Sequence, residues 1–211
     1  MENNKPLAAL TFDDGPNIYT TPQVIEKLKQ YGVVASFFLV GDNITEKTEA
    51  VTRSEFEMGC EIHNHSRTHS AMSQLSPEEM RAEIAFTNEK VKGITGVEPR
   101  FFRPPYIAVS AEMYDNIDLT FIAGIGAEDW LDEVSAEQRA EKILSQVCDG
   151  SIILLHDMRG NYRTVNALDI IIPELLARGY ELVTVSELFR REGVEPVRGR
   201  VYSNVFQKGE F

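Results

Sequence analysis

Residues 7–16 read LAALTFDDGP, and this stretch carries the clearest signal of the fold. Residues 7–12 form a short apolar run, which is typical of a strand buried on both faces. Asp13 and Asp14 follow the run directly, and Gly15 and Pro16 then turn the chain sharply. We therefore expect a buried strand that delivers two carboxylates to its carboxyl end.

Six further runs have the same character. They are short, contain many β-branched and aromatic residues, and are bounded by glycine, proline or charged turns: residues 33–40, 60–63, 100–102, 121–124, 151–155 and 181–185. Segments of helical period separate these runs, so we expect parallel strands wrapped by helices. Seven strands suggest an α/β fold of the (β/α)7 type, a barrel with one unit fewer than the eightfold barrel.

The segments between the strands carry recognisable helix signals. One has an apolar stripe with charged residues on the opposite face, made by Val24, Ile25, Leu28 and Tyr31. The sequence SPEE at residues 76–79 predicts a capping box with proline at the first helical position. Ser135 and Gln138 repeat the box ahead of an expected helix over residues 140–147. Pro173 lies in a later helical pattern and predicts either a kink or a helix start.

The length and net charge of the chain restrict the number of domains and the classes of binding partner. The 211 residues suit one domain, 1–211, in which residues 190–211 form a C-terminal extension that matches no motif. With 21 basic and 33 acidic residues the net charge is −12, which opposes binding to nucleic acid or to an anionic membrane surface. No apolar run is long enough to span a bilayer. A neutral glycan or a cation is a more suitable partner, and the oligomeric state stays open.

The two cysteines are too few to form a disulfide framework. Cys60 and Cys148 fit no zinc motif, and we expect both to be buried as small apolar residues. The first residues, MENNKP, show no signal-peptide pattern, but the start of the chain does not settle the compartment.

Chemically useful side chains follow the predicted strands rather than the helices. In chain order they are Asp13, Asp14, His65, His69, Arg103, Asp129, Trp130 and His156. Because the carboxyl ends of the strands in a closed parallel sheet meet on one face, we expect these residues to share one pocket.

The histidines suggest a metal site. The chain has four, and three of them lie within residues 61–69. His65 and His69 are four residues apart, so one helical turn would present both rings to a single divalent ion. The alternative is a polar loop whose histidines only form hydrogen bonds. We expect His63 to face away from the site, because it precedes the turn.

The adjacent carboxylates of Asp13 and Asp14 point in different directions, so one can reach a metal while the other stays free. Their mutual repulsion is costly unless a cation or proton relieves it. The alternative is a solvated turn in which the pair serves only backbone geometry.

His156 and Arg103 complete the set. His156 ends an apolar strand, and its pKa range suits a proton donor, although a group at the rim of the core is the alternative. Arg103 keeps its charge and needs a carboxylate or a ligand, although a structural ion pair would also satisfy it. Together these groups fit metal-assisted hydrolysis.

The sequence resembles the polysaccharide deacetylases of carbohydrate esterase family 4, which share the chitooligosaccharide deacetylase homology domain. Five motifs occur in the family's order: TFDDGP at residues 11–16, HSRTH at 65–69, RPPY at 103–106, DW at 129–130 and LLH at 154–156. The resemblance implies a distorted (β/α)7 barrel, in agreement with the strand count.

The resemblance also implies roles. Asp14, His65 and His69 would hold one divalent metal ion, commonly zinc, although cobalt or nickel can serve. Asp13 would be the general base and His156 the general acid.

The remaining motif residues would support this chemistry. Arg103 would orient Asp13, and Asp129 would orient His156. The backbone amide of Tyr106 would help to stabilise the oxyanion, while Trp130 and Leu154 would form the pocket wall around the acetyl methyl group.

One position departs from the family pattern, because Gly126 stands where the fourth motif often has another acidic residue. We expect this to change the shape of the groove or its hydrogen bonds rather than the chemistry.

By resemblance, the activity would be deacetylation with metal-activated water. The N-acetyl group of a GlcNAc-containing polysaccharide, such as peptidoglycan or chitin oligomers, would be the substrate. The first alternative is an acetylxylan O-acetyl esterase, and the second is a catalytically silent carbohydrate-binding module on the same fold. The family resemblance further suggests a secreted or cell-surface protein, although a cytoplasmic location is also compatible.

Overall fold

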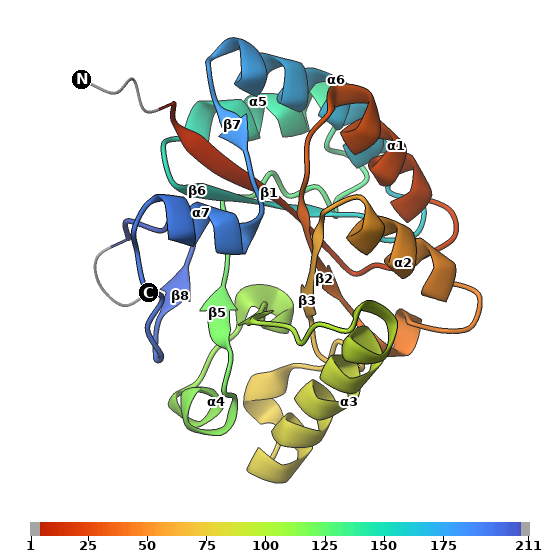
Figure 1. Ribbon diagram of the computed structural model, residues 1–211, viewed down its shortest axis with the longest axis vertical. Coiled ribbons are helices and arrows are strands. Elements are labelled where there is room, and N and C mark those ends of the chain that lie inside the picture. Colours follow the sequence, from red (N-terminus) through yellow and green to blue (C-terminus); the bar gives the residue numbers. More distant parts are fainter. Residues whose placement is uncertain (1–4, 208–211) are drawn as a thin grey trace.

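The computed structural model describes residues 5–207, which form one eight-stranded sheet and seven α-helices (Figure 1). The strands are β1 (Leu7–Asp13), β2 (Ser36–Leu39), β3 (Glu61–Asn64), β4 (Phe101–Phe102), β5 (Thr120–Ile122), β6 (Ser151–His156), β7 (Glu181–Leu182) and β8 (Val201–Tyr202). The helices are α1 (Thr21–Tyr31), α2 (Glu49–Glu57), α3 (Pro77–Thr95), α4 (Ala111–Asn116), α5 (Ala136–Gln146), α6 (Tyr162–Ala177) and α7 (Val185–Arg191).

The sheet is a nearly closed barrel of parallel strands. Neighbouring strands run in the order β6-β1-β2-β3-β4-β5-β8, and every pairing between these strands is parallel. Two isolated bridges join the ends of this path, one from Ile125 to Ile153 and one from Ser151 to Asn204. The helices surround the strands (Figure 1). The predicted barrel of seven parallel strands wrapped by helices is therefore confirmed.

One of the seven strands is not the one that the sequence indicates. The expected run at residues 181–185 contributes only β7, which pairs with the start of β1 beside the main path. The seventh place is taken by β8, which pairs with β5 and lies in the segment 190–211 for which no motif was found. A strand of two residues is too short to show a periodicity. Residues 208–211 of that segment lie outside the described part of the chain.

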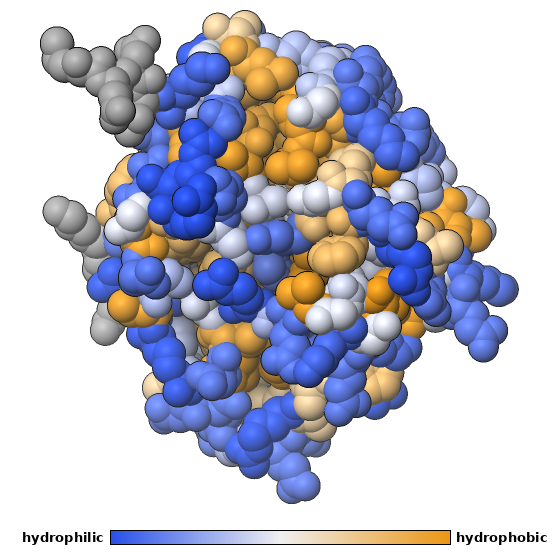
Figure 2. Space-filling view, viewed as in Figure 1, coloured by the Kyte–Doolittle hydropathy of each residue, from blue (hydrophilic) through white to orange (hydrophobic). Residues whose placement is uncertain are grey.

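Alternate residues of β1 enter two different apolar clusters. Ala8 and Leu10 pack under the surrounding helices, whereas Leu7 and Ala9 pack inside the barrel with residues of β5, β6 and β8. All seven residues of β1 are buried, as expected for a strand that is covered on both faces. The outside is polar over most of the periphery, while hydrophobic residues gather between β7 and α1 on the face shown in Figure 2.

The helix signals gave mostly correct predictions. Both capping boxes form, at Ser76 and at Ser135, although the second helix begins at Ala136 rather than at residue 140. Pro173 lies inside α6, which runs without interruption through Ala177, so no helix starts at the proline.

The cysteine prediction was half right, because Cys60 is buried but Cys148 is exposed. Cys148 stands in the turn before β6, where its Sγ atom lies 3.4 Å from Ser151 Oγ. Within residues 5–207, the helices are all too short or too polar to traverse a lipid bilayer.

We predict that Tyr202→Ala destabilises the barrel by about 3–5 kcal/mol, the usual cost of truncating a buried aromatic side chain. Tyr202 is 1% exposed, packs against Phe189, and accepts a hydrogen bond from the Val197 amide at 3.0 Å. Urea unfolding measures the change. The matched control is Val197→Ala. Because the Val197 side chain is exposed, its truncation should change the free energy of unfolding by less than about 0.5 kcal/mol. Equal free energies of unfolding for the two variants would contradict the role of β8 as the seventh strand of the barrel.

Candidate functional site

A cavity of about 480 Å³ opens at the carboxyl ends of the strands. Its lining residues are Asp13, Asp14, His65, His69, Pro104, Tyr106, Ile107, Trp130, Leu154 and His156. Eight of these are residues that the sequence singled out. The two other predicted residues, Arg103 and Asp129, are fully buried behind the cavity wall. The strand ends therefore bring together residues that are up to 143 positions apart in sequence, from Asp13 to His156.

Strand register places the two central groups. β1 and β6 pair in parallel with Asp13 opposite His156. Because side chains alternate along a strand, Leu154 and His156 share a face, and both line the cavity. The two groups thus lie on adjacent strands at the mouth of the barrel.

Asp14, His65 and His69 form a cluster that could hold a metal ion. One ligand atom of each lies within 4.8 Å of the others. The Asp14 carboxylate oxygen is 3.5 Å from His65 Nε2 and 3.4 Å from His69 Nε2. One carboxylate and two imidazoles are a ligand set typical of zinc and of similar divalent ions.

The two histidines do not lie on a helical turn, and that prediction was wrong. Residues 65–69 form a loop in which Ser66 and His69 have positive φ angles of 65° and 58°. The His69 amide donates to Ser66 Oγ at 3.0 Å, which stabilises the reversal of the loop. The rings nevertheless meet, with centroids 4.9 Å apart. A tight loop therefore achieves what the four-residue spacing suggested for a helix.

A backbone carbonyl fixes the tautomer of His65. The Nδ1 atom lies 2.6 Å from the carbonyl oxygen of Arg103, and this oxygen can only accept a hydrogen bond. Nδ1 must therefore carry a proton, which leaves the lone pair of Nε2 free on the side of Asp14. A hydrogen bond of this kind is the usual partner of a histidine that binds metal.

The charges in the cluster also suit a cation. Burial by itself would raise the pKa of Asp14, but in the metal-free cluster the hydrogen bond from the protonated form of His65, together with the positive charge of the neighbouring histidines, lowers it to about 2. Burial and the nearby His65 lower the pKa of His69. Both shifts favour the forms that bind metals, an ionised carboxylate and a neutral imidazole.

His63 stays outside this cluster, as expected, although for another reason. Its ring does not face away but lies inside the barrel between Phe38 and Phe101, with centroid distances of 5.3 and 4.9 Å. Its Nε2 atom contacts Glu61 at 3.1 Å. The ring therefore lies below the cavity rather than in it.

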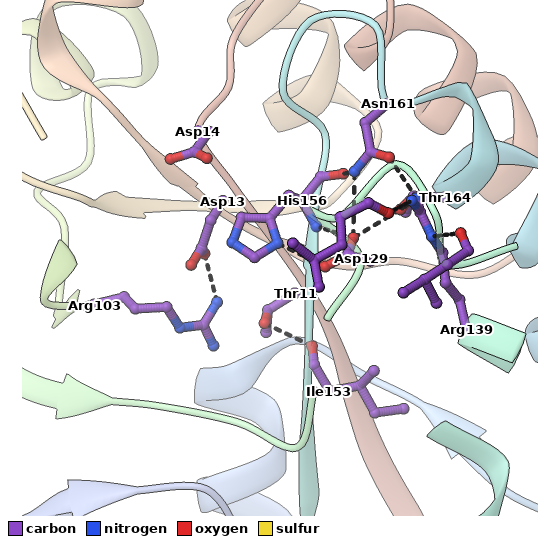
Figure 3. Close-up of polar contacts among 12 residues, drawn as sticks. Thr11, Asp13, Asp14, Arg103, Asp129, Arg139, Ile153, His156, Asn161 and Thr164 are labelled. Carbon is purple, nitrogen blue, oxygen red and sulfur yellow. Dashed lines mark hydrogen bonds and ion pairs between the residues drawn. The ribbon is translucent and has the colours of Figure 1, made fainter. Parts of the chain in front are cut away.

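Asp13 is held by a buried arginine. Arg103 Nη1 donates to Asp13 Oδ1 at 2.5 Å (Figure 3). Nη2 donates to the Ala123 carbonyl at 2.6 Å. The guanidinium is fully buried and lies over the Phe38 ring at 4.2 Å. The second carboxylate oxygen of Asp13 is 3.8 Å from His65 Nε2. One oxygen is thus anchored, and the other faces the metal cluster.

His156 is held by Asp129 in an equally defined way. Asp129 Oδ1 lies 2.7 Å from His156 Nδ1, and Oδ2 accepts from the His156 backbone amide at 2.8 Å. Burial would lower the pKa of His156, but the hydrogen bond and charge of Asp129, together with Asp13 and Asp14, raise it to about 9. The other ring nitrogen faces the cavity near Asp13 (Figure 3). At neutral pH the ring is therefore a cation that can give up a proton.

Three groups behind Asp129 were missed in the sequence. Thr164, Asn161 and Arg139 form a buried network that reaches Asp129 Oδ2 (Figure 3). A signal for Arg139 was available, because this charged residue shares the buried face of α5 with Ala140 and Ile143. Thr164 and Asn161 gave no such signal, since polar residues are common at the start of a helix.

Aromatic residues stand at the cavity mouth. Tyr106 is 70% and Trp130 50% exposed, and the two rings contact His69 and His156, respectively. Tyr106 has a positive φ of 61° in a short 3-10 turn, Pro105–Ile107. At Gly126, an added side-chain carbon would meet nothing within 4 Å. Gly126, which stands in place of the acidic residue of the fourth motif, therefore borders open space.

Comparisons with known proteins agree with this geometry. Residues 1–121 match the family model described as polysaccharide deacetylase. A bifunctional xylanase/deacetylase of Pseudobutyrivibrio xylanivorans is 48% identical over 96% of this chain and 34% of its own length. A peptidoglycan-N-acetylglucosamine deacetylase, PgdA of Listeria monocytogenes, is 36% identical over 89% of this chain and 40% of its own. The chain thus spans between a third and two fifths of these relatives.

A solved structure is similar over nearly the whole chain. The family 4 acetyl xylan esterase from Clostridium thermocellum, solved in complex with a cobalt ion, superposes with a TM-score of 0.92. It is 44% identical, and the match covers 95% of this chain and 100% of that one.

We predict that His69→Ala and Asp14→Asn each lower zinc affinity by more than about a hundredfold, because even residues that only support a ligand are worth 10–100-fold. Asp13→Asn should keep the metal, since Asp13 is anchored to Arg103 instead. Metal content after dialysis against limiting zinc is the measurement. Equal loss from the Asp13 and Asp14 variants would erase the distinction between the two carboxylates.

We also predict that Asp129→Asn lowers the pKa of His156 from about 9 towards its ordinary 6.5. The amide removes the negative charge that stabilises the protonated ring, so the ring loses its proton at lower pH. NMR titration of the histidine ring nitrogens in metal-free protein measures the shift, with wild type as control. An unchanged His156 titration would show that Asp129 is not its main partner.

Proposed function

Because this chain belongs to the polysaccharide deacetylase family, we propose that it is a metal-dependent hydrolase that removes acetyl groups from a carbohydrate. The observation that carries the proposal is the position of Asp13 and His156 at the cavity mouth, next to the cluster of Asp14, His65 and His69. One cavity thus offers a free carboxylate, a proton donor and a set of metal ligands. This combination is suited to hydrolysis of an amide or ester.

We assign one divalent metal ion to Asp14, His65 and His69, with zinc as the ion and cobalt or nickel able to replace it. The ligand set and the fixed tautomer of His65 support the assignment, as does the cobalt in the related esterase. When bound, the ion would lower the pKa of a water molecule and polarise the acetyl carbonyl.

Asp13 acts as the general base that takes a proton from the attacking water. Its Oδ1 atom is occupied by Arg103, so the proton goes to Oδ2, which faces the metal cluster. The fixed positive charge of Arg103 lies against the anchored oxygen of Asp13. Arg103 therefore orients the base.

His156 acts as the general acid that protonates the departing atom. Asp129 occupies its Nδ1 atom, so the proton leaves from Nε2, which faces the cavity. The backbone amide of Tyr106 helps to stabilise the negative charge of the tetrahedral intermediate. Trp130 and Leu154 enclose the acetyl methyl group. His156, Tyr106, Trp130 and Leu154 all line the same cavity, as these roles require.

The substrate proposed first is an N-acetyl group of a GlcNAc-containing polysaccharide, peptidoglycan or chitin oligomers. The peptidoglycan deacetylase at 36% identity supports it. The second candidate is the O-acetyl group of acetylxylan, which is favoured by the higher identities of 48% and 44% to proteins named for xylan chemistry. Action on a polymer of either kind supports a location outside the cell or at its surface. A silent binding module would not need the anchored carboxylate of Asp13 or the pair formed by His156 and Asp129 that this cavity retains.

We predict acetate release from at least one member of a panel of chitin oligomers, peptidoglycan and acetylated xylan. The Asp13→Asn variant should release acetate about 10²–10⁴-fold more slowly, the usual contribution of a general base, while keeping its metal. Acetate is quantified by a coupled enzymatic assay. A zinc-loaded wild-type protein that releases no acetate from any of the three would overturn the proposed function, and the relative rates choose between the amide and the ester.

A further inference from the structure

Arg139 is a buried charge that no motif of the site includes. Its side chain is 1% exposed on the inner face of α5. Two of its nitrogens bind the backbone that follows Asp129: Nη2 donates to the Leu131 carbonyl at 2.9 Å, and Nε donates to the Val134 carbonyl at 3.0 Å. One side of the guanidinium thus holds the turn that carries Asp129.

The remaining nitrogen of Arg139 binds the start of α6. Nη1 donates to Asn161 Oδ1 at 2.5 Å and to Thr164 Oγ1 at 2.8 Å. Both of these side chains also contact Asp129 Oδ2, Thr164 at 2.7 Å and Asn161 at 3.4 Å. Arg139 is therefore one step away from the carboxylate that holds His156.

We propose that Arg139 is a positioning residue that fixes Asp129, and through Asp129 the ring of His156, in the orientation needed for proton donation to the leaving group. This inference rests on the proposed function, because it assigns Arg139 a part in the general-acid step.

The argument follows from the direction of the hydrogen bonds. A guanidinium has five N–H donors and no acceptor, so Thr164 Oγ1 must accept from Arg139. The hydroxyl proton of Thr164 is then free to point at Asp129 Oδ2. In the same way Asn161 Oδ1 must accept from Arg139, which turns the amide nitrogen of Asn161 towards Asp129 and towards the His156 carbonyl at 2.9 Å. Arg139 thus turns both neighbours into donors to one carboxylate.

Without Arg139, Thr164 and Asn161 lose the hydrogen bonds that fix their orientation. The Thr164 hydroxyl could rotate away, and the Asn161 amide could flip and present its oxygen to the carboxylate of Asp129. The buried carboxylate would also lose the guanidinium behind it and the fixed orientation of the two side chains that contact its Oδ2 atom. The geometry of the pair formed by Asp129 and His156 would then no longer be unique.

The first test compares Arg139→Met with wild type on two substrates. An amine or a sugar hydroxyl leaves poorly unless it is protonated, whereas nitrophenolate leaves without help. Hydrolysis of the preferred acetylated glycan should fall at least about tenfold, part of the 10²–10⁴-fold that a general acid contributes, while 4-nitrophenyl acetate hydrolysis changes less than about twofold. A folded, zinc-loaded variant that keeps both rates, or that loses both equally, would overturn the proposal.

The second test observes His156 directly and needs no substrate. The chain has only four histidines, so the ring Nδ1 proton of His156 can be assigned by its loss in His156→Ala. In zinc-loaded wild type this proton, held by Asp129, should resonate far downfield and exchange slowly. Arg139→Met should shift it upfield and speed its exchange, and an unchanged signal would refute the role. If wild type hydrolyses no glycan, the proposed function fails, while this signal still tests Arg139.

Two further variants separate positioning from general stability. Thr164→Val removes the hydroxyl between Arg139 and Asp129, should reproduce the substrate pattern, and remains informative if the Arg139 variant does not fold. Combined with Arg139→Met, its effect should be less than additive, and full additivity would contradict a shared path. The control is Arg178→Met, an arginine that joins α6 to the Leu144 carbonyl of α5 at 2.7 Å away from the site and should leave both rates unchanged.

Discussion

The parallel pairing of β1 with β6, which sets Asp13 opposite His156, positions the two residues that we propose as base and acid. Side chains alternate between the faces of a strand, so a slip of one residue would send Asp13 or His156 into the layer under the helices. A hydrogen bond from Thr11 Oγ1 to the Ile153 carbonyl at 2.7 Å strengthens the same pair of strands (Figure 3). The proposed base and acid are therefore positioned by the most extensively paired strands of the barrel, and loops add the proposed metal ligands.

This arrangement requires charges to be buried, which costs free energy unless each charge is paired and hydrogen-bonded. The structure satisfies that condition twice. Arg103 balances Asp13 at one side of the cavity, and Arg139 lies behind Asp129 at the other. In both places an arginine lies behind a buried carboxylate. The same contacts that make the interior tolerable to polar groups also orient Asp13 and His156.

Substrate choice depends on other parts of the cavity. An amide and an ester pass through similar tetrahedral intermediates, so the proposed roles of Asp13 and His156 suit either substrate. The exposed rings of Tyr106 and Trp130 stand at the cavity mouth, and such amphipathic surfaces are common in ligand sites. These positions, rather than the reacting groups, are where specificity for one glycan would be set.

The fold and most of the site could be read from the sequence, because buried strands and the polar residues that end them are local patterns. Asp13, Asp14, His65, His69 and His156 were all named in this way. The β8 strand, the loop geometry of residues 65–69, the interior place of His63 and the network of Arg139 could not be. Each depends on partners far away in the chain, and a short strand or a single buried charge has no meaning until packing brings those partners into contact.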